Sequence, residues 1–414
     1  MQTNLIESIR HTADGQEAES ILRACVHCGF CTATCPTYQL LGNELDSPRG
    51  RIYLIKEMLE GAEVTAKTML HLDRCLTCRS CETTCPSGVQ YGRLVDIGRG
   101  YAEEKTGRSM GQRIQRGLLR RVLPRPAVFN SLLAAGRLVR PLLPRSVARS
   151  IPVAQKTTAR PAARHARTML VLEGCVQPGL APNTNAAAAC VLDRLGVSLV
   201  GAEKAGCCGA VSYHLNAHAD GLDYMRRNID AWYPHVEQGA EAVVMTASGC
   251  GAMVKEYGHL LRHDPAYAAK AARISALTRD LSEVLAAEKD GLLNLLTPAQ
   301  RGKVAFHAPC TLQHGQRIVG VIEQLLTAAG YELTPVADKH LCCGSAGTYS
   351  ILQQELSQQL LRNKLAALQS GQPVQIASAN IGCQTHLQSG TDLPVRHWIE
   401  LLDEALGTAA SARN

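Results

Sequence analysis

Apolar residues recur at helical spacing in the first hundred residues of the chain. In the best-defined stretch, Ile52, Ile55 and Leu59 fall on one face of a helix. Ser47 is a favourable N-cap and Pro48 suits the first helical position, so a helix is expected to begin at Pro48. The same spacing predicts a helical lead-in and two further helices, over residues 1–24, 65–72 and 89–104. This part of the chain is therefore expected to be α-helical.

From residue 168 onward the pattern changes to short apolar runs that alternate with helical stretches. The β-like runs cover residues 168–172, 197–200, 242–246, 303–306, 332–336 and 374–377, and helices are expected over residues 186–195 and 318–329. Strands that alternate with helices predict parallel sheets with right-handed crossovers. The expected fold class is therefore α+β multidomain, with a helical unit followed by two α/β units.

The segment between these two parts, residues 105–167, alternates Arg with Leu, Val and Ala and predicts two amphipathic helices, over residues 111–123 and 127–139. Fifteen of the 43 Lys and Arg residues lie between residues 105 and 172, where there is no Asp or Glu. Outside this segment the chain has 28 basic and 36 acidic residues, a net charge of −8. The net charge of +7 for the whole chain therefore comes from this segment. Two interpretations stay open: a connector with a solvated basic face, or a surface that docks on an acidic partner or anionic lipid.

Composition narrows the classes of function. A hydrophobic content of 46% is ordinary for a globular protein, whereas an aromatic content of 4% disfavours stacking on nucleic acid bases. Seventeen cysteines and no secretory-type start indicate a reducing compartment in which thiolates hold metal. The longest uncharged runs contain helix-breaking residues, so none is expected to cross a bilayer. Any membrane contact is therefore expected to be peripheral.

Eight of the cysteines form two runs with the spacing C-x2-C-x2-C-x3-C-P. The first run holds Cys25, Cys28, Cys31 and Cys35, and the second holds Cys75, Cys78, Cys81 and Cys85. Two-cluster ferredoxins have this spacing, and in them the fourth cysteine of each run ligates the other cluster. The runs predict two [4Fe–4S] clusters, one on Cys25, Cys28, Cys31 and Cys85 and one on Cys75, Cys78, Cys81 and Cys35. The alternative is a pair of zinc sites, but zinc stops at four ligands and usually takes paired C-x2-C knuckles.

The α/β part contains an internal cysteine repeat. Cys175 is followed 32 residues later by Cys207-Cys208-Gly209 and then by Cys250, and Cys310 is followed at the same spacing by Cys342-Cys343-Gly344 and then by Cys383. These cysteines come near the carboxyl ends of the predicted strands, where open α/β sheets build their sites. A metal or cluster site, buried structural thiols and a redox-active vicinal disulfide all stay open. The nearby histidines are expected to be hydrogen-bonded residues rather than ligands: His214, His307, His314, His340 and His386.

With these motifs in place, the chain resembles the family of iron–sulfur subunits of glycolate oxidase (glycolate dehydrogenase) over nearly its whole length. Besides the doubled Cys-Cys-Gly turn, the resemblance rests on three stretches: Cys35-Pro36-Thr37-Tyr38, Ser47-Pro48-Arg49-Gly50-Arg51-Ile52-Tyr53-Leu54 and Cys75-Leu76-Thr77-Cys78. The resemblance implies an electron-transfer subunit that takes electrons from FAD-containing subunits oxidising glycolate to glyoxylate. It passes them towards quinone, at the cytoplasmic face of the inner membrane. No flavin or nicotinamide motif occurs in the chain, so the substrate chemistry is expected on a partner.

Relatives with the same architecture keep other functions open: a subunit of an (S)-lactate or glycerol-3-phosphate dehydrogenase, or a heterodisulfide-reductase-like thiol–disulfide enzyme. In the last of these families the final cysteine of a repeat belongs to a C-x-x-C pair, whereas here Met253 follows Cys250 and His386 follows Cys383. Imidazole can replace thiolate on iron. The second repeat is therefore the better candidate for a further cluster, on Cys310, Cys342, Cys343 and Cys383 with His386 beside them, and the first repeat is expected to be structural.

The patterns together divide the chain into four expected parts. These are an α-helical ferredoxin domain with two 4Fe–4S clusters at 1–104, a basic helical linker at 105–167, and two CCG cysteine-rich domains at 168–300 and 301–414. The expected partners are FAD-binding subunits in a hetero-oligomer and a quinone or membrane acceptor. Nucleic acid is not expected as a partner, because a basic segment without aromatic residues is poor evidence for it.

Overall fold

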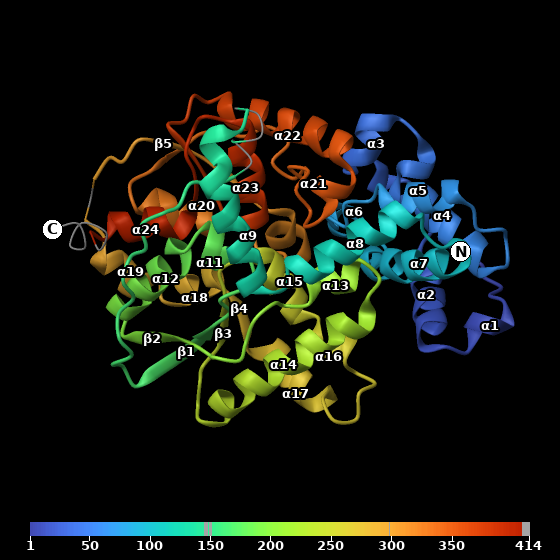
Figure 1. Cartoon of the computed structure of the whole chain (residues 1–414), viewed down its shortest axis with the longest axis horizontal. Coiled ribbons are helices and arrows are strands. Elements are labelled where there is room, and N and C mark those ends of the chain that lie inside the picture. Colours follow the sequence, from blue (N-terminus) through green and yellow to red (C-terminus); the bar gives the residue numbers. More distant parts are fainter. Residues whose placement is uncertain (145–147, 149–150, 298, 408–414) are drawn as a thin grey trace.

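The computed structural model describes residues 1–144, 148, 151–297 and 299–407. Figure 1 shows the N-terminal helices gathered at one end of the molecule and the two α/β repeats, residues 167–295 and 303–405, filling the other end. The helices α8 (Met110–Val122) and α9 (Pro126–Val139) run between the two ends. The chain therefore has the order of helical and α/β units that the hydrophobic pattern predicts.

The N-terminal part is built only of helices and short turns, as expected. Its helices are α1 (Glu7–Arg10), α2 (Ala13–Ala24), α3 (Pro36–Leu41), α4 (Pro48–Leu59), α5 (Ala66–Asp73), α6 (Ser80–Thr84) and α7 (Tyr91–Thr106). The prediction of a helix start at Pro48 is confirmed, because the Ser47 side chain accepts a hydrogen bond from the Gly50 backbone N–H at 2.9 Å. Ile52, Ile55 and Leu59 are buried together with Leu22 in one apolar core.

Each repeat contains a four-stranded, wholly parallel sheet. The first repeat holds β1 (Arg167–Val171), α11 (Gln177–Leu180), α12 (Asn183–Arg194), β2 (Val197–Gly201), α13 (Ala210–His214), α14 (His218–Glu237), β3 (Val243–Met245), α15 (Ser248–Lys255), α16 (Tyr257–Leu260), α17 (Ala268–Leu277), β4 (Thr278–Asp280), α18 (Leu281–Ala287) and α19 (Lys289–Leu295). The second holds β5 (Lys303–His307), α20 (Val321–Ala328), β6 (Glu332–Leu333), α21 (Tyr349–Leu352), α22 (Gln354–Gln369), β7 (Gln375–Ser378), α23 (Ile381–Gly390), β8 (Val395–His397) and α24 (Trp398–Ala405).

The strand orders β2-β1-β3-β4 and β6-β5-β7-β8 are the same arrangement used twice. The parallel pairing confirms the prediction from alternating strands and helices. Two strands were not predicted, β4 and β8, each three residues long and polar in part. The predicted strand at residues 332–336 is also shorter than expected, because β6 ends at Leu333.

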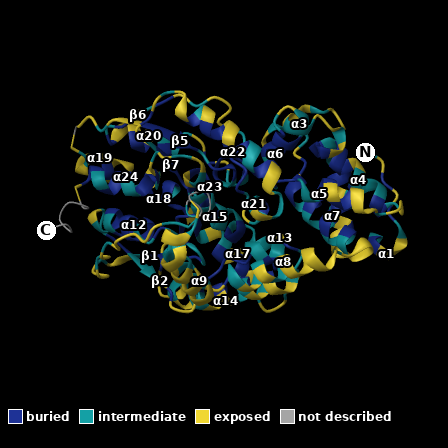
Figure 2. Cartoon of the chain, turned by 45° about the horizontal axis from the view of Figure 1, so that its top comes forward, coloured by how far each residue is buried: buried dark blue, intermediate teal, exposed yellow. Residues whose placement is uncertain are grey.

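The two repeats pack against each other through one hydrophobic core. Leu192 on α12 and Trp398 and Leu402 on α24 belong to the same buried cluster, together with Phe306 of β5. The backbone also bridges the repeats, since the Ser248 N–H donates to the Ala379 carbonyl at 3.0 Å. Figure 2 shows this buried interior between the elements, with exposed residues on the outer faces. The carboxyl ends of the two sheets are thus held close to each other.

The helical part is fixed to the repeats by ion pairs and hydrogen bonds. Glu256 of the first repeat pairs with Arg93 at 2.7 Å and with Arg79 at 3.3 Å. In the second repeat, the Tyr349 hydroxyl donates to the Arg74 carbonyl at 3.1 Å. The cysteine run at 75–85 therefore lies against both repeats.

Candidate metal centres

Five cysteines from the two runs line a first cavity of about 430 Å³ near the surface of the helical part: Cys25, Cys28, Cys31, Cys81 and Cys85. The backbone between the first three cysteines turns through left-handed conformations at His27 (φ 59°) and Gly29 (φ 87°). These turns wrap the chain around the cavity, and Cys85 enters it from the other run. The cavity lies near solvent, because Cys28 is exposed and the flanking Val26 and Phe30 are 67% and 61% exposed.

The three other cysteines of the two runs, together with Cys81, line a second cavity of about 300 Å³: Cys35, Cys75, Cys78 and Cys81. Thr77 (φ 51°) and Arg79 (φ 61°) occupy the places that His27 and Gly29 have in the first run, so both runs use the same turns. A left-handed conformation is uncommon for residues other than Gly and marks a backbone held in place by its surroundings. Cys81 lines both cavities, which therefore adjoin.

The donors in both cavities suit an iron–sulfur cluster better than single zinc ions. Each cavity offers at least four thiols, enough for the four ligands of a [4Fe–4S] cluster. A single ion with bonds of about 2.3 Å needs its ligands within roughly 4.6 Å of one another. Among the described residues, no three of these eight sulfurs lie within 4.8 Å of one another. The distances between these sulfurs therefore suit a group larger than a single ion, such as an iron–sulfur cluster.

The cysteines of the second cavity are more deeply buried than those of the first, since Cys35, Cys75 and Cys81 are buried whereas Cys28 is exposed. Burial raises the pKa of the Cys78 and Cys81 thiols well above the usual range, and neighbouring thiols raise it further. A bound cation lowers the pKa of such thiols instead, because a coordinated thiol is deprotonated. The Tyr91 hydroxyl donates to Cys75 Sγ at 3.5 Å, and Thr37 Oγ1 lies 3.3 Å from Cys35 Sγ. Both Tyr91 and Thr37 also line this cavity.

A buried ionic cluster that the sequence analysis missed supports the loops of the second cavity. The Asp46 carboxylate, fully buried, contacts Arg51 at 3.4 Å, His71 at 3.0 Å and Arg74 at 3.0 Å. Arg51 is itself 1% exposed and donates to the His71 carbonyl at 2.7 Å. The Asp46 carbonyl accepts from Thr37 Oγ1 at 2.9 Å. Asp46 thus ties the segment after the first run to the segment before the second.

In the second repeat, the structure brings all four predicted cysteines together at the carboxyl edge of the sheet. Cys310, Cys342, Cys343 and Cys383 are all buried, and each thiol contacts the next in this order. Cys310 and Cys342 also share an apolar cluster with Cys78. These four thiols therefore connect the second repeat with the second cavity.

The histidine beside these thiols is His307 and not His386. His386 Nε2 lies 3.2 Å from Ser357 Oγ, and His386 belongs to no group of three potential ligands within 4.8 Å of one another among the described residues. His307, at the end of β5, has a ring nitrogen that lies with Cys343 Sγ and Cys383 Sγ within 4.8 Å of one another. Burial, together with the charge of Lys364, lowers the pKa of His307 to about 3, so the ring is neutral at pH 7. The expectation that His307 is a hydrogen-bonded residue is wrong, since neither ring nitrogen has a partner among the described residues.

The first repeat gathers its four cysteines in the same way but without an imidazole. Cys175 and Cys250 line a cavity of about 290 Å³, and Cys207 and Cys208 are buried beside them. The two Cys-Cys-Gly turns are alike, since the Gly209 and Gly344 N–H groups each donate to the first cysteine of their turn at 3.4 Å. Among the described residues of this repeat, no three potential ligands lie within 4.8 Å of one another.

Comparisons with known proteins match three parts of the chain to known domain families. Residues 21–89 match a 4Fe–4S dicluster domain, and residues 169–255 and 304–388 each match a cysteine-rich domain. The chain is 59% identical over 407 residues to the glycolate oxidase iron–sulfur subunit of Escherichia coli (strain K12), which covers 98% of this chain and 99% of that protein. It is 29% identical to the probable glycolate oxidase iron–sulfur subunit of Bacillus subtilis (strain 168), over 95% of this chain and 96% of that protein.

A more distant similarity covers about half of the chain. Lactate utilization protein A of Bacillus licheniformis is 30% identical over 243 residues, which is 55% of this chain and 96% of that protein.

In the part of the chain that the structure describes, no helix combines the length and the apolar character needed to cross a bilayer.

Proposed function

Because the chain belongs to the family of glycolate oxidase iron–sulfur subunits, we propose that it relays electrons from an FAD-containing partner subunit, which oxidises glycolate to glyoxylate, towards the quinone of the respiratory chain. The pair of adjoining cavities, each lined by at least four cysteines, carries this proposal. When bound, [4Fe–4S] clusters take up and release one electron at a time. Reduction of the clusters by glycolate in the purified complex is the experiment that tests it.

The proposed ligands follow the two cavities. Cys25, Cys28, Cys31 and Cys85 hold one cluster, and Cys75, Cys78, Cys81 and Cys35 hold the other. The exposed apolar side chains of Val26 and Phe30 beside the first cavity give a partner protein a surface to dock on close to a cluster. The second cavity, which faces the repeats, lies further along the electron path. A third cluster on Cys310, Cys342, Cys343 and Cys383 is the alternative to a single metal ion at Cys343 and Cys383, and iron analysis distinguishes the two.

Tyr91 is proposed to adjust the reduction potential of the second cluster. A hydrogen bond to a ligand sulfur favours the reduced, more negative cluster, so Tyr91→Phe is expected to lower the potential. A bond worth about 0.5–1.5 kcal/mol corresponds to about 20–60 mV for one electron. Redox titration followed by EPR measures the shift. Tyr53→Phe, at a half-exposed tyrosine of α4, is the control, and equal potentials in both variants would contradict this role.

The structure divides the positive charges of the basic segment, residues 105–167, into two groups. Several arginines bind acids of other elements and so act as connectors: Arg108 and Arg116 with Asp73, Arg160 with Glu173, Arg164 with Asp193 and Arg167 with Glu241. Arg113, Arg120 and Arg121 on α8 have no acidic partner among the described residues. We propose that this face of α8, with the exposed Ile114 and Leu118, lies on an anionic membrane surface at the cytoplasmic side.

Charge reversal on α8 tests the membrane contact. The triple variant Arg113→Glu, Arg120→Glu and Arg121→Glu is expected to bind anionic vesicles at least ten times more weakly, since each basic residue near such a surface contributes about 1 kcal/mol. Arg116 is left intact because of its ion pair with Asp73. Vesicle sedimentation at rising salt measures binding. Reversal of three exposed lysines elsewhere, Lys67, Lys204 and Lys289, is the matched control, and equal binding of both variants would leave α8 as a connector only.

A 2-hydroxy acid other than glycolate is the second candidate substrate for the partner, because of the similarity to lactate utilization protein A. Comparing glycolate and lactate as reductants of the same complex separates the two. The thiol–disulfide alternative is disfavoured, because the paired thiols of both repeats are at most 4% exposed and offer no access to a disulfide substrate: Cys207, Cys208, Cys342 and Cys343.

A further inference from the structure

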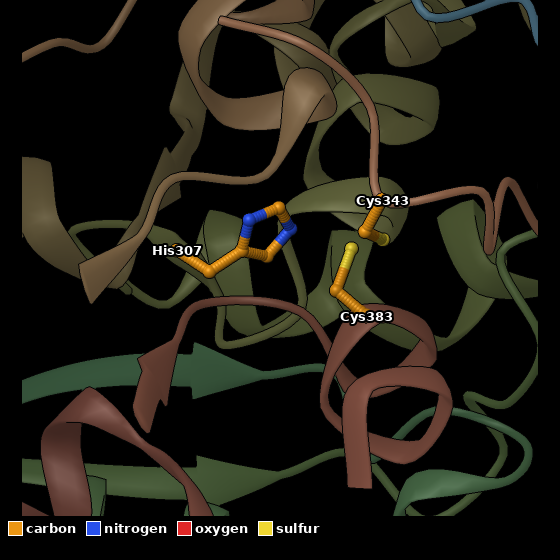
Figure 3. A group of neighbouring side chains, drawn as sticks. All are labelled: His307, Cys343 and Cys383. Atoms are coloured by element: carbon orange, nitrogen blue, oxygen red, sulfur yellow. The ribbon is translucent and has the colours of Figure 1, made fainter. Parts of the chain in front are cut away.

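The second repeat contains a group of three potential ligands that the proposed electron transfer does not use. His307 ends strand β5, Cys343 lies in the turn before α21, and Cys383 lies in the first turn of α23. Figure 3 shows the His307 ring turned towards the side chains of Cys343 and Cys383. One ligand atom from each lies within 4.8 Å of the other two. We propose that these residues bind one soft divalent metal ion of the zinc class.

The burial of His307 requires a partner of this kind. Its side chain is 1% exposed, and neither Nδ1 nor Nε2 has a hydrogen-bond partner among the described residues. A buried polar group without a partner costs about 1–3 kcal/mol, so such groups are rare in native proteins. A metal ion bound to one ring nitrogen removes part of this cost. Imidazole and thiolate are the ligands that zinc prefers.

The spacing of the three donors distinguishes a single ion from a cluster. Bonds of about 2.0–2.3 Å place two ligands of one zinc ion no more than roughly 4.6 Å apart. The 4.8 Å limit met by His307, Cys343 and Cys383 is close to this value. None of the ferredoxin-type cysteine sets meets it in the described part of the chain. The second repeat therefore has the donor spacing of a single ion, and three protein ligands leave a fourth coordination position for a smaller ligand.

The surroundings supply the charge that thiolate ligands need. The buried ammonium group of Lys364 lies near Cys343, Cys342 and Cys310 and donates to the Asp338 carbonyl at 2.8 Å. A positive charge beside a thiol stabilises the thiolate, which is the form that binds metals. Two thiolates and a neutral imidazole around a divalent ion leave the site itself without net charge.

The first repeat provides an internal comparison. It shares the sheet order, the Cys-Cys-Gly turn and the final cysteine with the second repeat. Three residues before Cys175, however, stands Leu172, where His307 stands three residues before Cys310. Leu172 is buried and offers no ligand. The metal site is therefore specific to the second repeat.

Metal analysis of the full chain, reconstituted anaerobically with its clusters, tests the proposal. After incubation with Zn²⁺ and removal of free metal, the wild type is expected to retain one zinc ion per chain in addition to its iron. His307→Gln and Cys383→Ser are expected to lose the zinc while iron and sulfide stay at the wild-type level. Cys250→Ser, at the matching position of the first repeat, is expected to keep it. Co²⁺ in place of Zn²⁺ adds a spectroscopic readout, the thiolate-to-cobalt charge-transfer band.

Two results would overturn the proposal. The first is a wild type that retains no zinc, or variants that retain as much as the wild type. The second is a loss of iron and sulfide from His307→Gln or Cys383→Ser, which would assign the site to a third cluster. His307→Cys guards against a folding defect, because it supplies another zinc ligand and is expected to restore the bound ion. Failure of this variant to bind zinc while its far-UV circular dichroism matches the wild type would also count against the site.

Discussion

Replacing Cys78 by Ala is expected to lower the iron content of the anaerobically reconstituted chain from about eight atoms to about four, because one of two [4Fe–4S] clusters loses a ligand. Cys28→Ala is expected to have the same effect on the other cluster. In the complex with the flavoprotein partner, glycolate still reduces the flavin in both variants, but electrons no longer reach quinone. Iron and sulfide analysis, flavin absorbance and quinone reduction measure these three properties.

The matched control is Cys190→Ala. Cys190 lies on α12, is partly exposed, and belongs neither to the two runs nor to the repeated cysteine pattern. Its replacement is expected to leave iron content and quinone reduction unchanged. An iron content near four in the wild type, or quinone reduction at the wild-type rate by Cys78→Ala, would refute the assignment of the two cavities.

The second large effect is expected at Asp46. Asp46→Ala leaves the buried guanidinium of Arg51 without its carboxylate and removes the partner of His71 and Arg74. Breaking a buried ion pair by removing one partner costs about 3–5 kcal/mol of folding free energy. The loss is expected to lower the unfolding midpoint strongly and to loosen the second cluster first, since Asp46 joins the segments that carry Cys35 and Cys75.

Urea unfolding followed by circular dichroism, with cluster absorbance recorded in parallel, measures the Asp46 effect. The control is Asp223→Ala, whose carboxylate is 73% exposed and pairs with Arg226 on the surface. Exposed pairs contribute about 0–1 kcal/mol, so this variant is expected to unfold close to the wild type. Similar midpoints for the two variants would show that the buried cluster of charges does not hold the loops.

Local patterns predicted most of the framework because their causes are local. Ser47 and Pro48 mark a helix start whatever surrounds them, and alternating apolar runs require parallel sheets. The strands β4 and β8 were not predicted, because a three-residue strand is too short to show a hydrophobic periodicity. They form by pairing, β4 with β3 and β8 with β7. The cysteine spacing likewise predicted that thiols of both runs meet, and each cavity is lined by cysteines of both runs.

The choice of histidine in the second repeat could not be made from spacing alone. His386 stands three residues after Cys383 and so takes the position of a missing cysteine, but on helix α23 its ring turns to Ser357. His307 is far from Cys343 and Cys383 in sequence and reaches them only because β5 ends at the same edge of the sheet. One feature of the sequence could have indicated His307: it stands at the end of a predicted buried strand, where parallel α/β sheets build their sites.

The role of the basic segment also depended on tertiary structure. In the sequence, Arg116 cannot be told from the other arginines of α8. In the structure, it forms an ion pair with Asp73 of α5. Arg167 similarly binds Glu241 and Glu288, more than 70 residues away. A count of charges cannot tell such buried or bridging arginines from the exposed ones, because the acids that pair with them lie elsewhere in the chain.

We propose above all that this chain carries electrons from a glycolate-oxidising flavoprotein through two clusters. Anaerobic addition of glycolate to the purified complex, with freeze-quench EPR, tests it most directly. Signals of two reduced [4Fe–4S] clusters are expected to appear after flavin reduction and to disappear when a quinone is added. A complex in which glycolate fully reduces the flavin while both clusters stay oxidised would contradict it.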